Sequence, residues 1–135
     1  MKQGISWSKV LLPPAVLFVL SELIAQVTDW YRVYPWIDIP MHFFGGLLTA
    51  VSVQEFFQFC RVRGYLGKLH PLLEVMFVTA LVVVVAVFWE WHEFLRDTIF
   101  HTHLQISQGD TMHDLLMGMS GGLLGALVSV RKRSG

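Results

Sequence analysis

Carboxylate and imidazole side chains recur at helical spacing in three separate segments of the sequence. They are Asp38 and His42, Glu90 and Glu93, and Asp110, His113 and Asp114. Residues three or four positions apart lie on one face of a helix, so each set offers neighbouring side chains to a single site. Mixed carboxylate and imidazole ligands suit zinc, manganese or iron. The pattern therefore predicts a divalent metal site, and in the absence of a metal it predicts Glu90 or His42 as a general base.

Several of these residues also have a structural explanation. Asp110 precedes an apolar segment, where aspartate is a preferred helix cap, and Asp38 stands in a similar place two positions before Pro40. Glu93 lies near the end of an apolar run, from which its side chain can reach lipid headgroups. Asp114 lies a full turn inside its predicted helix, so capping does not explain it, and the functional interpretation is stronger there.

The composition of the chain indicates a membrane protein. The chain has 135 residues, of which 54% are hydrophobic and 15% charged, and its net charge at pH 7 is zero. A soluble domain has about 25% charged residues. A chain of this length with so few charged residues is unlike a water-soluble enzyme. Its lack of excess positive charge argues against nucleic-acid binding.

Four apolar segments approach the length of about 20 residues that a membrane-spanning helix needs. They are residues 10–26, 40–60, 72–95 and 111–130. Their connections are short, which favours antiparallel neighbours in a bundle. The sequence thus predicts an all-α polytopic membrane protein, a single domain over residues 1–135 with four transmembrane helices. The first segment is interpreted as a retained helix, because Glu22 interrupts it and no cleavage site of small residues follows.

Basic residues gather on one side of this arrangement. Eight of the ten lysines and arginines fall before the first helix, between the second and third, and after the fourth. The positive-inside rule places these segments, and with them both termini, in the cytoplasm. Eight of the ten acidic residues and five of the six histidines then lie in the outer half. We therefore expect a buried acidic and histidine site near the outer face, neutralised by protons or by a cation.

Small and polar residues mark the helix faces that are expected to pack together. In the second helix they are Asp38, His42, Gly45, Thr49 and Ser52. In the fourth helix they are Gly118, Gly121, Gly122 and Gly125, which form two overlapping G-x-x-x-G pairs. Such stripes face other helices and allow their backbones to approach closely.

Three short motifs, taken in order, resemble those of the VanZ-like family and of a related group of uncharacterised bacterial inner-membrane proteins. They are Asp38-x-x-x-His42-Phe43, Glu90-x-x-Glu93, and Asp110-x-x-x-Asp114 followed by Gly121. The resemblance covers roughly residues 38–130. It implies a polytopic protein of the bacterial inner membrane and, in some members, glycopeptide-antibiotic resistance. This chain departs from the VanZ-like pattern at Gly118, where asparagine is common, and at Glu93, where glutamine is common.

The sequence leaves three functions open. A metal ion near the outer face would activate water or polarise a phosphate or carbonyl group of a lipid-linked substrate, in a hydrolase or a transferase. Acidic groups within a membrane also mark proton or cation pathways, and a transporter of this size would need a homo-oligomer. The third function is a structural network in an accessory membrane protein. The expected partners are membrane lipids and, for the enzyme, the lipid-linked substrate.

Overall fold

The described part of the chain is entirely helical. The computed structural model describes residues 12, 16, 17, 19–21, 23, 24 and 33–134. Within these ranges there is no strand, and a short 3-10 helix, η1 (Pro35–Ile37), precedes α3 (Asp38–Val62), α4 (Pro71–Phe100) and α5 (Gln108–Ser134). The long helices correspond to the spans expected at 40–60, 72–95 and 111–130, with a few more residues at each end. Each described residue from 12 to 24 is helical, but the bounds of the span expected at 10–26 lie outside the described residues.

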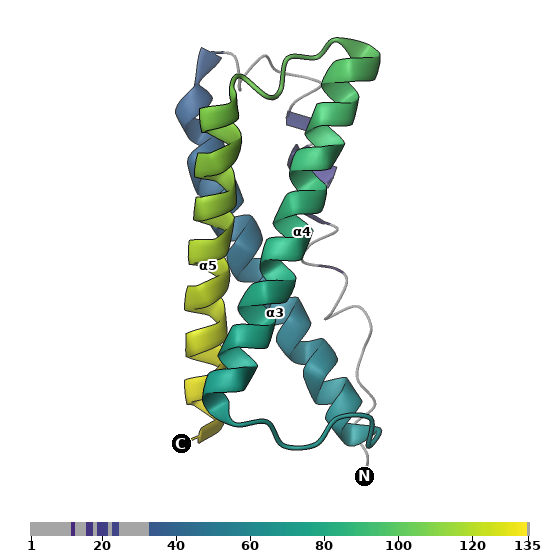
Figure 1. The fold of residues 1–135 in the computed structure, drawn as a ribbon, viewed down its shortest axis with the longest axis vertical. Helices are drawn as coiled ribbons and strands as arrows, with labels where there is room; N and C mark the ends of the chain where they lie inside the picture. Colours follow the sequence, from purple (N-terminus) through teal and green to yellow (C-terminus); the bar gives the residue numbers. More distant parts are fainter. Residues whose placement is uncertain (1–11, 13–15, 18, 22, 25–32, 135) are drawn as a thin grey trace.

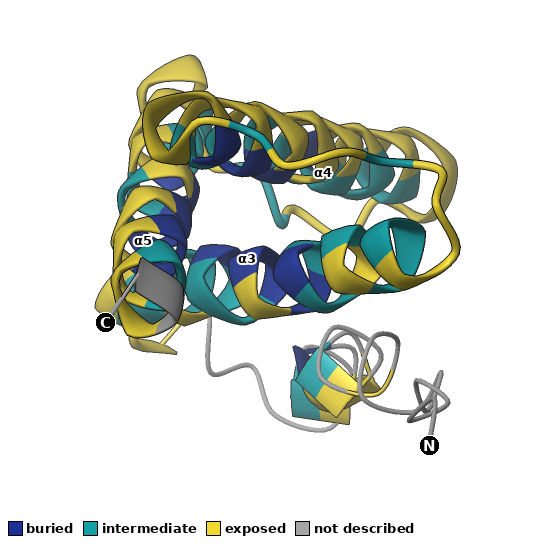
Figure 2. Cartoon of the chain, turned by 90° about the horizontal axis from the view of Figure 1, so that it is seen from below, coloured by how far each residue is buried: buried dark blue, intermediate teal, exposed yellow. Residues whose placement is uncertain are grey.

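The three long helices surround a common interior, and α5 packs against both α3 and α4 (Figures 1 and 2). The connection between α4 and α5 lies at the upper end in Figure 1, and the connection between α3 and α4 lies at the lower end. Helices adjacent in the sequence are therefore antiparallel. The upper end brings together the start of α3, the end of α4 and the start of α5, which are the parts that contain the acidic and histidine motifs.

Two of the described helices are long and apolar enough to cross a membrane. They are α4, over Pro71–Phe100, and α5, over Gln108–Lys132. The third long helix, α3, is interrupted by polar side chains in its second half, including Gln54, Glu55 and Gln58. By length and composition α4 and α5 are candidate spans, and the expected count of four transmembrane helices stays a prediction.

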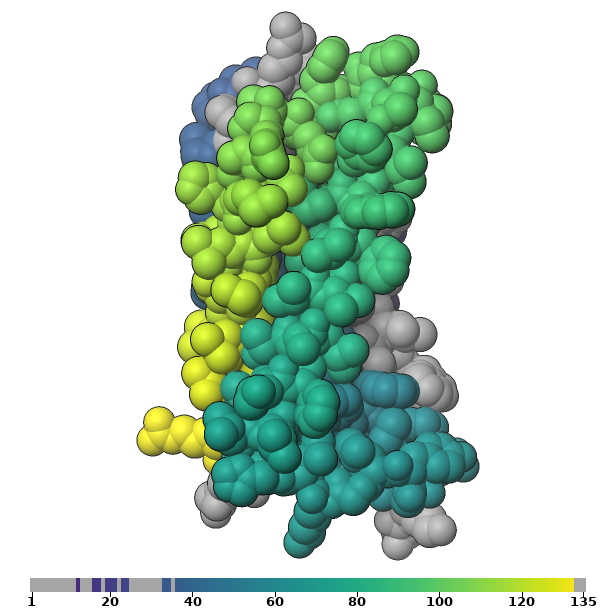
Figure 3. All heavy atoms as spheres, viewed as in Figure 1, coloured from purple at the N-terminus to yellow at the C-terminus, as the bar shows by residue number. Residues whose placement is uncertain are grey.

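The distribution of side chains is the reverse of that in a water-soluble bundle. Large apolar side chains point outward, with Phe88 69% and Trp91 65% exposed. The interior instead contains small and polar residues such as Ala50, Thr49 and Ser52 (dark blue in Figure 2). Figure 3 shows the side chains of α4 and α5 as one continuous surface along the molecule. An apolar outer surface of this extent suits contact with lipid, where packing between small residues holds the helices together.

Glycines bring α5 into direct backbone contact with α3. A Cβ atom at Gly46 would collide with the carbonyl group of Gly118, and one at Gly121 would collide with the carbonyl oxygen of Phe43. A Cβ atom at Gly122 would lie 2.6 Å from Cγ1 of Val82 on α4. The glycine stripe of α5 therefore packs closely against both α3 and α4, as the sequence predicts.

The lower end of the bundle is closed by a glycine turn and an ion pair. After α3 the chain turns at Gly64, whose φ of +77° favours glycine, and the amide of Tyr65 donates to the carbonyl of Cys60 at 2.8 Å. Arg61 at the end of α3 donates to Glu74 in the first turn of α4. These contacts fix the two helices at the end opposite to the acidic motifs.

Replacement of Gly121 by alanine tests the backbone contact between α3 and α5. The added methyl group has no room against the Phe43 carbonyl, so we expect Gly121→Ala to lower stability by about 1–3 kcal/mol. The measurement is the thermal unfolding midpoint in a neutral detergent. Gly45→Ala is the matched control, because among the described residues a Cβ atom there meets only Leu17, at 4.0 Å. Equal midpoints for the Gly121→Ala variant and the unmodified chain would contradict the packing described here.

Candidate metal centre

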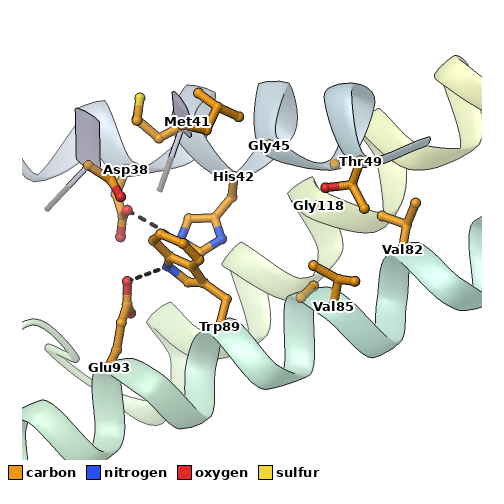
Figure 4. A pocket seen from close by; sticks show the side chains of 14 residues that line it. Asp38, Met41, His42, Gly45, Thr49, Val82, Val85, Trp89, Glu93 and Gly118 are labelled. Carbon is orange, nitrogen blue, oxygen red and sulfur yellow. Dashed lines mark hydrogen bonds and ion pairs between the residues drawn. The ribbon is translucent and has the colours of Figure 1, made fainter. Parts of the chain in front are cut away.

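His42 lies at the centre of the polar cluster near the upper end of the bundle. Its side chain is only 8% exposed, and its two ring nitrogens face carboxylates on different helices. The Nε2 atom lies 3.3 Å from Oδ1 of Asp38, one turn earlier on α3 (Figure 4). The Nδ1 atom lies 3.9 Å from Oε1 of Glu90 on α4. A single imidazole ring thus joins the acidic residues of two helices.

Two sets of side chains have the spacing of metal ligands, and His42 belongs to both. One set is Asp38, His42 and Asp114, and the other is His42, Glu90 and Glu93. Within each set, the donor atoms lie within 4.8 Å of one another. Because Asp114 comes from α5, all three long helices contribute to the cluster, and separation of any one of them would dismantle part of it.

Glu90 has one carboxylate oxygen that is satisfied and one that is not. Its side chain is 6% exposed, and Oε2 accepts a hydrogen bond of 3.1 Å from the side-chain amide of Gln105. Oε1 is buried and has no hydrogen-bond partner among the described residues. A buried carboxylate oxygen without a partner is costly, and Nδ1 of His42, at 3.9 Å, is too distant for a hydrogen bond. A cation between Glu90 and His42 would satisfy this oxygen.

Glu93 completes this side of the cluster from the next turn of α4. Its Oε1 atom accepts a hydrogen bond of 2.8 Å from the indole nitrogen of Trp89, four residues earlier. Both side chains line a cavity together with Asp38 and His42, as Figure 4 shows. The indole therefore orients Glu93 toward His42, and a second carboxylate faces the same space as Glu90.

Asp97 fastens the connection between α4 and α5 over the cluster. Its Oδ1 atom accepts hydrogen bonds from the hydroxyl of Thr102 at 2.6 Å and the amide of Leu104 at 2.7 Å, and Oδ2 accepts one from the amide of Gln105 at 2.8 Å. The side chain of Gln105 then donates to both the main-chain carbonyl and the carboxylate of Glu90. The loop backbone and the buried carboxylate are thus connected through one glutamine.

A cavity of about 260 Å³ extends from the cluster into the bundle. Its polar end is formed by Asp38, His42, Trp89 and Glu93. Further along, its walls are apolar side chains and glycines of α3, α4 and α5, with Ser21 and Thr49 as the polar exceptions among the described residues. The cavity therefore joins a charged end to an apolar interior.

A family comparison agrees with the apolar outer surface. The family described as "Predicted membrane protein (DUF2238)" matches residues 2–135. The chain belongs to this family. No curated protein and no solved structure matches the chain. The family assignment supports a membrane protein and does not connect DUF2238 to the VanZ-like family, so that resemblance stays a prediction.

In this DUF2238 protein, the cluster unites five of the seven residues proposed from the sequence as metal ligands. They are Asp38, His42, Glu90, Glu93 and Asp114. The other two, Asp110 and His113, are in neither set, and His113 is exposed. The expectation that Asp110 caps its helix as the preceding residue needs correction, because α5 begins two residues earlier, at Gln108. Ser107 accepts a hydrogen bond from the amide of Asp110 instead, at 3.1 Å.

Two contacts of the cluster were not anticipated from the sequence. Gln105 lies in a loop, where no periodic pattern indicates the direction of a side chain. Trp89 was not among the site residues predicted from the sequence, although its separation of four residues from Glu93 is the helical spacing that allows their contact.

Substitution of Asp97 tests how the loop is held. Three hydrogen bonds to one carboxylate are lost in Asp97→Ala, and bonds to charged groups contribute about 1.5–3 kcal/mol each. We expect hydrogen exchange at the amides of Leu104 and Gln105 to accelerate by more than tenfold, while the exchange of α5 amides stays unchanged. Thr98→Ala is the control, because the Thr98 hydroxyl contacts only a carbonyl of its own helix. Equal exchange rates in both variants would show that Asp97 does not hold the loop.

Proposed function

We propose that this membrane protein binds a divalent metal ion, zinc, manganese or iron, between α3 and α4. The observation on which the proposal depends is the buried Oε1 atom of Glu90, which has no hydrogen-bond partner among the described residues. It lies 3.9 Å from Nδ1 of His42, and Glu93 belongs to the same set. Ligand bonds of about 2.0–2.1 Å from an ion to nitrogen and oxygen are compatible with this separation.

The two sides of the His42 ring have different roles in this proposal. Metal-binding histidines usually donate their second ring N–H to a carboxylate, which fixes the tautomer and the orientation of the ring. Asp38 lies at 3.3 Å from Nε2 and is the nearer carboxylate, so it is suited to accept that N–H. Nδ1 is then the ligand atom, together with Glu90 and Glu93. Three protein ligands leave coordination positions for water or substrate, as in catalytic metal sites.

The proposed reaction is hydrolysis or group transfer on a lipid-linked substrate. A divalent ion lowers the pKa of a bound water and polarises a phosphoryl or carbonyl oxygen. His42 and Glu90 act as ligands here, and Asp114, which is 2% exposed and belongs to the set with His42, is placed to accept a proton. The shape of the cavity supports the choice of a lipid-linked substrate. The polar group of such a substrate would lie at the charged end of the cavity, and its lipid chain would lie along the apolar walls.

Transport receives less support from the described residues. A proton or cation pathway needs polar groups that continue through the bundle. Beyond His42, the described walls of the cavity offer only Ser21 and Thr49 as polar groups. Metal binding with chemistry at one end of the bundle fits this distribution better.

Metal analysis of the purified protein tests the proposal. We expect about one divalent ion per chain in the unmodified protein, and loss of that ion in both Glu90→Gln and Glu93→Gln. His113→Ala is the control, because this histidine is exposed and belongs to neither set. The content of zinc, manganese and iron is measured by mass spectrometry after purification without chelators. Metal-free protein that stays metal-free in the presence of excess zinc would exclude the proposal.

We also propose that the chain spans the inner membrane of a bacterium four times, with both termini in the cytoplasm. Arg61, Arg63 and Lys68 lie at the lower end of the bundle, which supports that end as the cytoplasmic one. The N-terminal basic residues of this argument lie outside the described residues.

Cysteine labelling tests this orientation. In a Cys60→Ser background, we expect Gln108→Cys to react with a membrane-impermeant maleimide in intact spheroplasts, and Gly67→Cys to react only after lysis. Both positions are exposed and lie at opposite ends of the bundle, so they form a matched pair. The reverse labelling pattern would overturn the orientation.

A further inference from the structure

The cavity next to the metal centre has the form of a slot for a chain. Along α3 its lining runs from Asp38 to Thr49, and along α4 from Glu93 to Val82. At 1.5 Å per residue, each wall is about 16 Å long. Between these ends, Gly45 leaves one wall without a side chain, and in the described part of the chain a Cβ atom there would meet only Leu17, at 4.0 Å. The slot is therefore long and apolar, and no side chain at Gly45 occupies it.

The charged end of the slot is strongly acidic. Asp38 from α3 and Glu93 from α4 both line it, and Glu90 and Asp114 lie behind His42. No lysine or arginine is among the described residues that line the cavity. A divalent ion would neutralise only part of this charge. The end therefore favours a cationic group and disfavours an anionic one.

Trp89 adds a feature that suits an organic cation. Its indole lines the same end of the slot and is held by Glu93 through the hydrogen bond of 2.8 Å. Ammonium groups are attracted to the faces of tryptophan rings, and sites of this kind combine aromatic rings with carboxylates. In Figure 4 the indole points from α4 toward α3, with its nitrogen directed at Glu93.

We propose that the slot binds an amphiphile with a cationic amine head and one hydrocarbon chain. The ammonium group lies between Asp38 and Glu93, beside Trp89, and the chain lies along Gly45 toward Val82. This ligand class goes beyond the proposed metal chemistry, and binding of the amphiphile does not require the ion. An anionic lipid would place its negative head group against the carboxylates of the slot. Charge complementarity therefore favours the cationic amphiphile over an anionic lipid.

Three probes separate the contributions of head and chain. They are dodecylamine, dodecyl phosphate and methylamine, each titrated into protein purified in a neutral maltoside detergent. An amine of this kind is protonated at pH 7. We expect dodecylamine to bind at least tenfold more tightly than dodecyl phosphate and methylamine to show no measurable binding. Native mass spectrometry gives the stoichiometry, and a titration followed by the unfolding midpoint gives the dissociation constant.

Substitutions in the wall and at the head then locate the ligand. We expect Gly45→Leu, which fills the slot, and Asp38→Asn, which removes a charge, each to weaken dodecylamine binding by at least tenfold. Gly45→Ala is the control with a smaller side chain. If Gly45→Leu does not fold, Val85→Phe narrows the same slot from α4. Equal binding of dodecyl phosphate, or unchanged affinity in the slot-filling variant, overturns the inference.

The outcome is distinguishable from that of the metal proposal. The titrations are made with zinc-loaded protein and with protein treated with chelator, and zinc content is measured in every variant. Gly45→Leu is expected to retain zinc, since Gly45 belongs to neither ligand set. Zinc binding without dodecylamine binding would reject the amphiphile and leave the metal centre standing, and the opposite result would reject the metal centre alone.

Discussion

The burial of carboxylates inside an apolar helix bundle is the constraint to which the rest of this structure responds. A charged side chain within a membrane helix costs roughly 2.5–3.5 kcal/mol near the centre, and less toward the interface. Glu90 and Asp114 are 5% and 2% exposed, and Asp38 and Glu93 lie close by. Several negative charges in a small volume also repel each other. Imidazole and indole groups from two helices and an amide group from one loop are directed at these carboxylates, yet among the described residues one oxygen of Glu90 lacks a hydrogen-bond partner.

The glycine contacts explain how the carboxylates of different helices come so close. Gly46 and Gly118 touch through their backbones, and each lies one turn after a member of the cluster, His42 and Asp114 respectively. Side chains of ordinary size hold helix axes 8–10 Å apart. At Gly46 there is no side chain to maintain that separation, so the turns that contain His42 and Asp114 are held side by side. The small residues therefore determine the geometry of the polar ones.

Much of this arrangement follows from helical periodicity, and the rest depends on where helices begin and how loops fold. The spacing of small and polar residues predicted one interior face of α3 with five members, Asp38, His42, Gly45, Thr49 and Ser52. The first four line the cavity, and Ser52 is buried without lining it. The same reasoning grouped Asp110 and His113 with Asp114, but α5 begins at Gln108. Asp110 therefore lies in the first turn of α5. There its amide donates to the hydroxyl of Ser107, and its carboxylate accepts from the amide of Ile106 in the loop.

Contacts from irregular segments had no periodic signal at all. Gln105 reaches Glu90 across fifteen residues only because Asp97 folds the loop back over the end of α4. Two residues of that connection, His101 and His103, have positive φ values of 55° and 60°. Backbone conformations of this kind are uncommon for histidine and are imposed by surrounding contacts, so they cannot be inferred from residue type. The position of the Glu90 carboxylate is for this reason a property of the folded loop and not of the α4 sequence.

This difference between local and distant contacts bears on the proposed centre. Asp38 and His42 belong to the same helix, so their 3.3 Å contact forms with the helix itself and orients the ring at the outset. Glu90 and Glu93 come from another helix, and Glu90 is further held by the loop. The nitrogen assigned to the metal therefore faces the ligands that only the complete fold brings into place. Because such a ligand set does not exist in the unfolded chain, the free energy of ion binding is added to that of folding. An ion at this position would thus stabilise the closed loop, and the closed loop would in turn define the coordination of the ion.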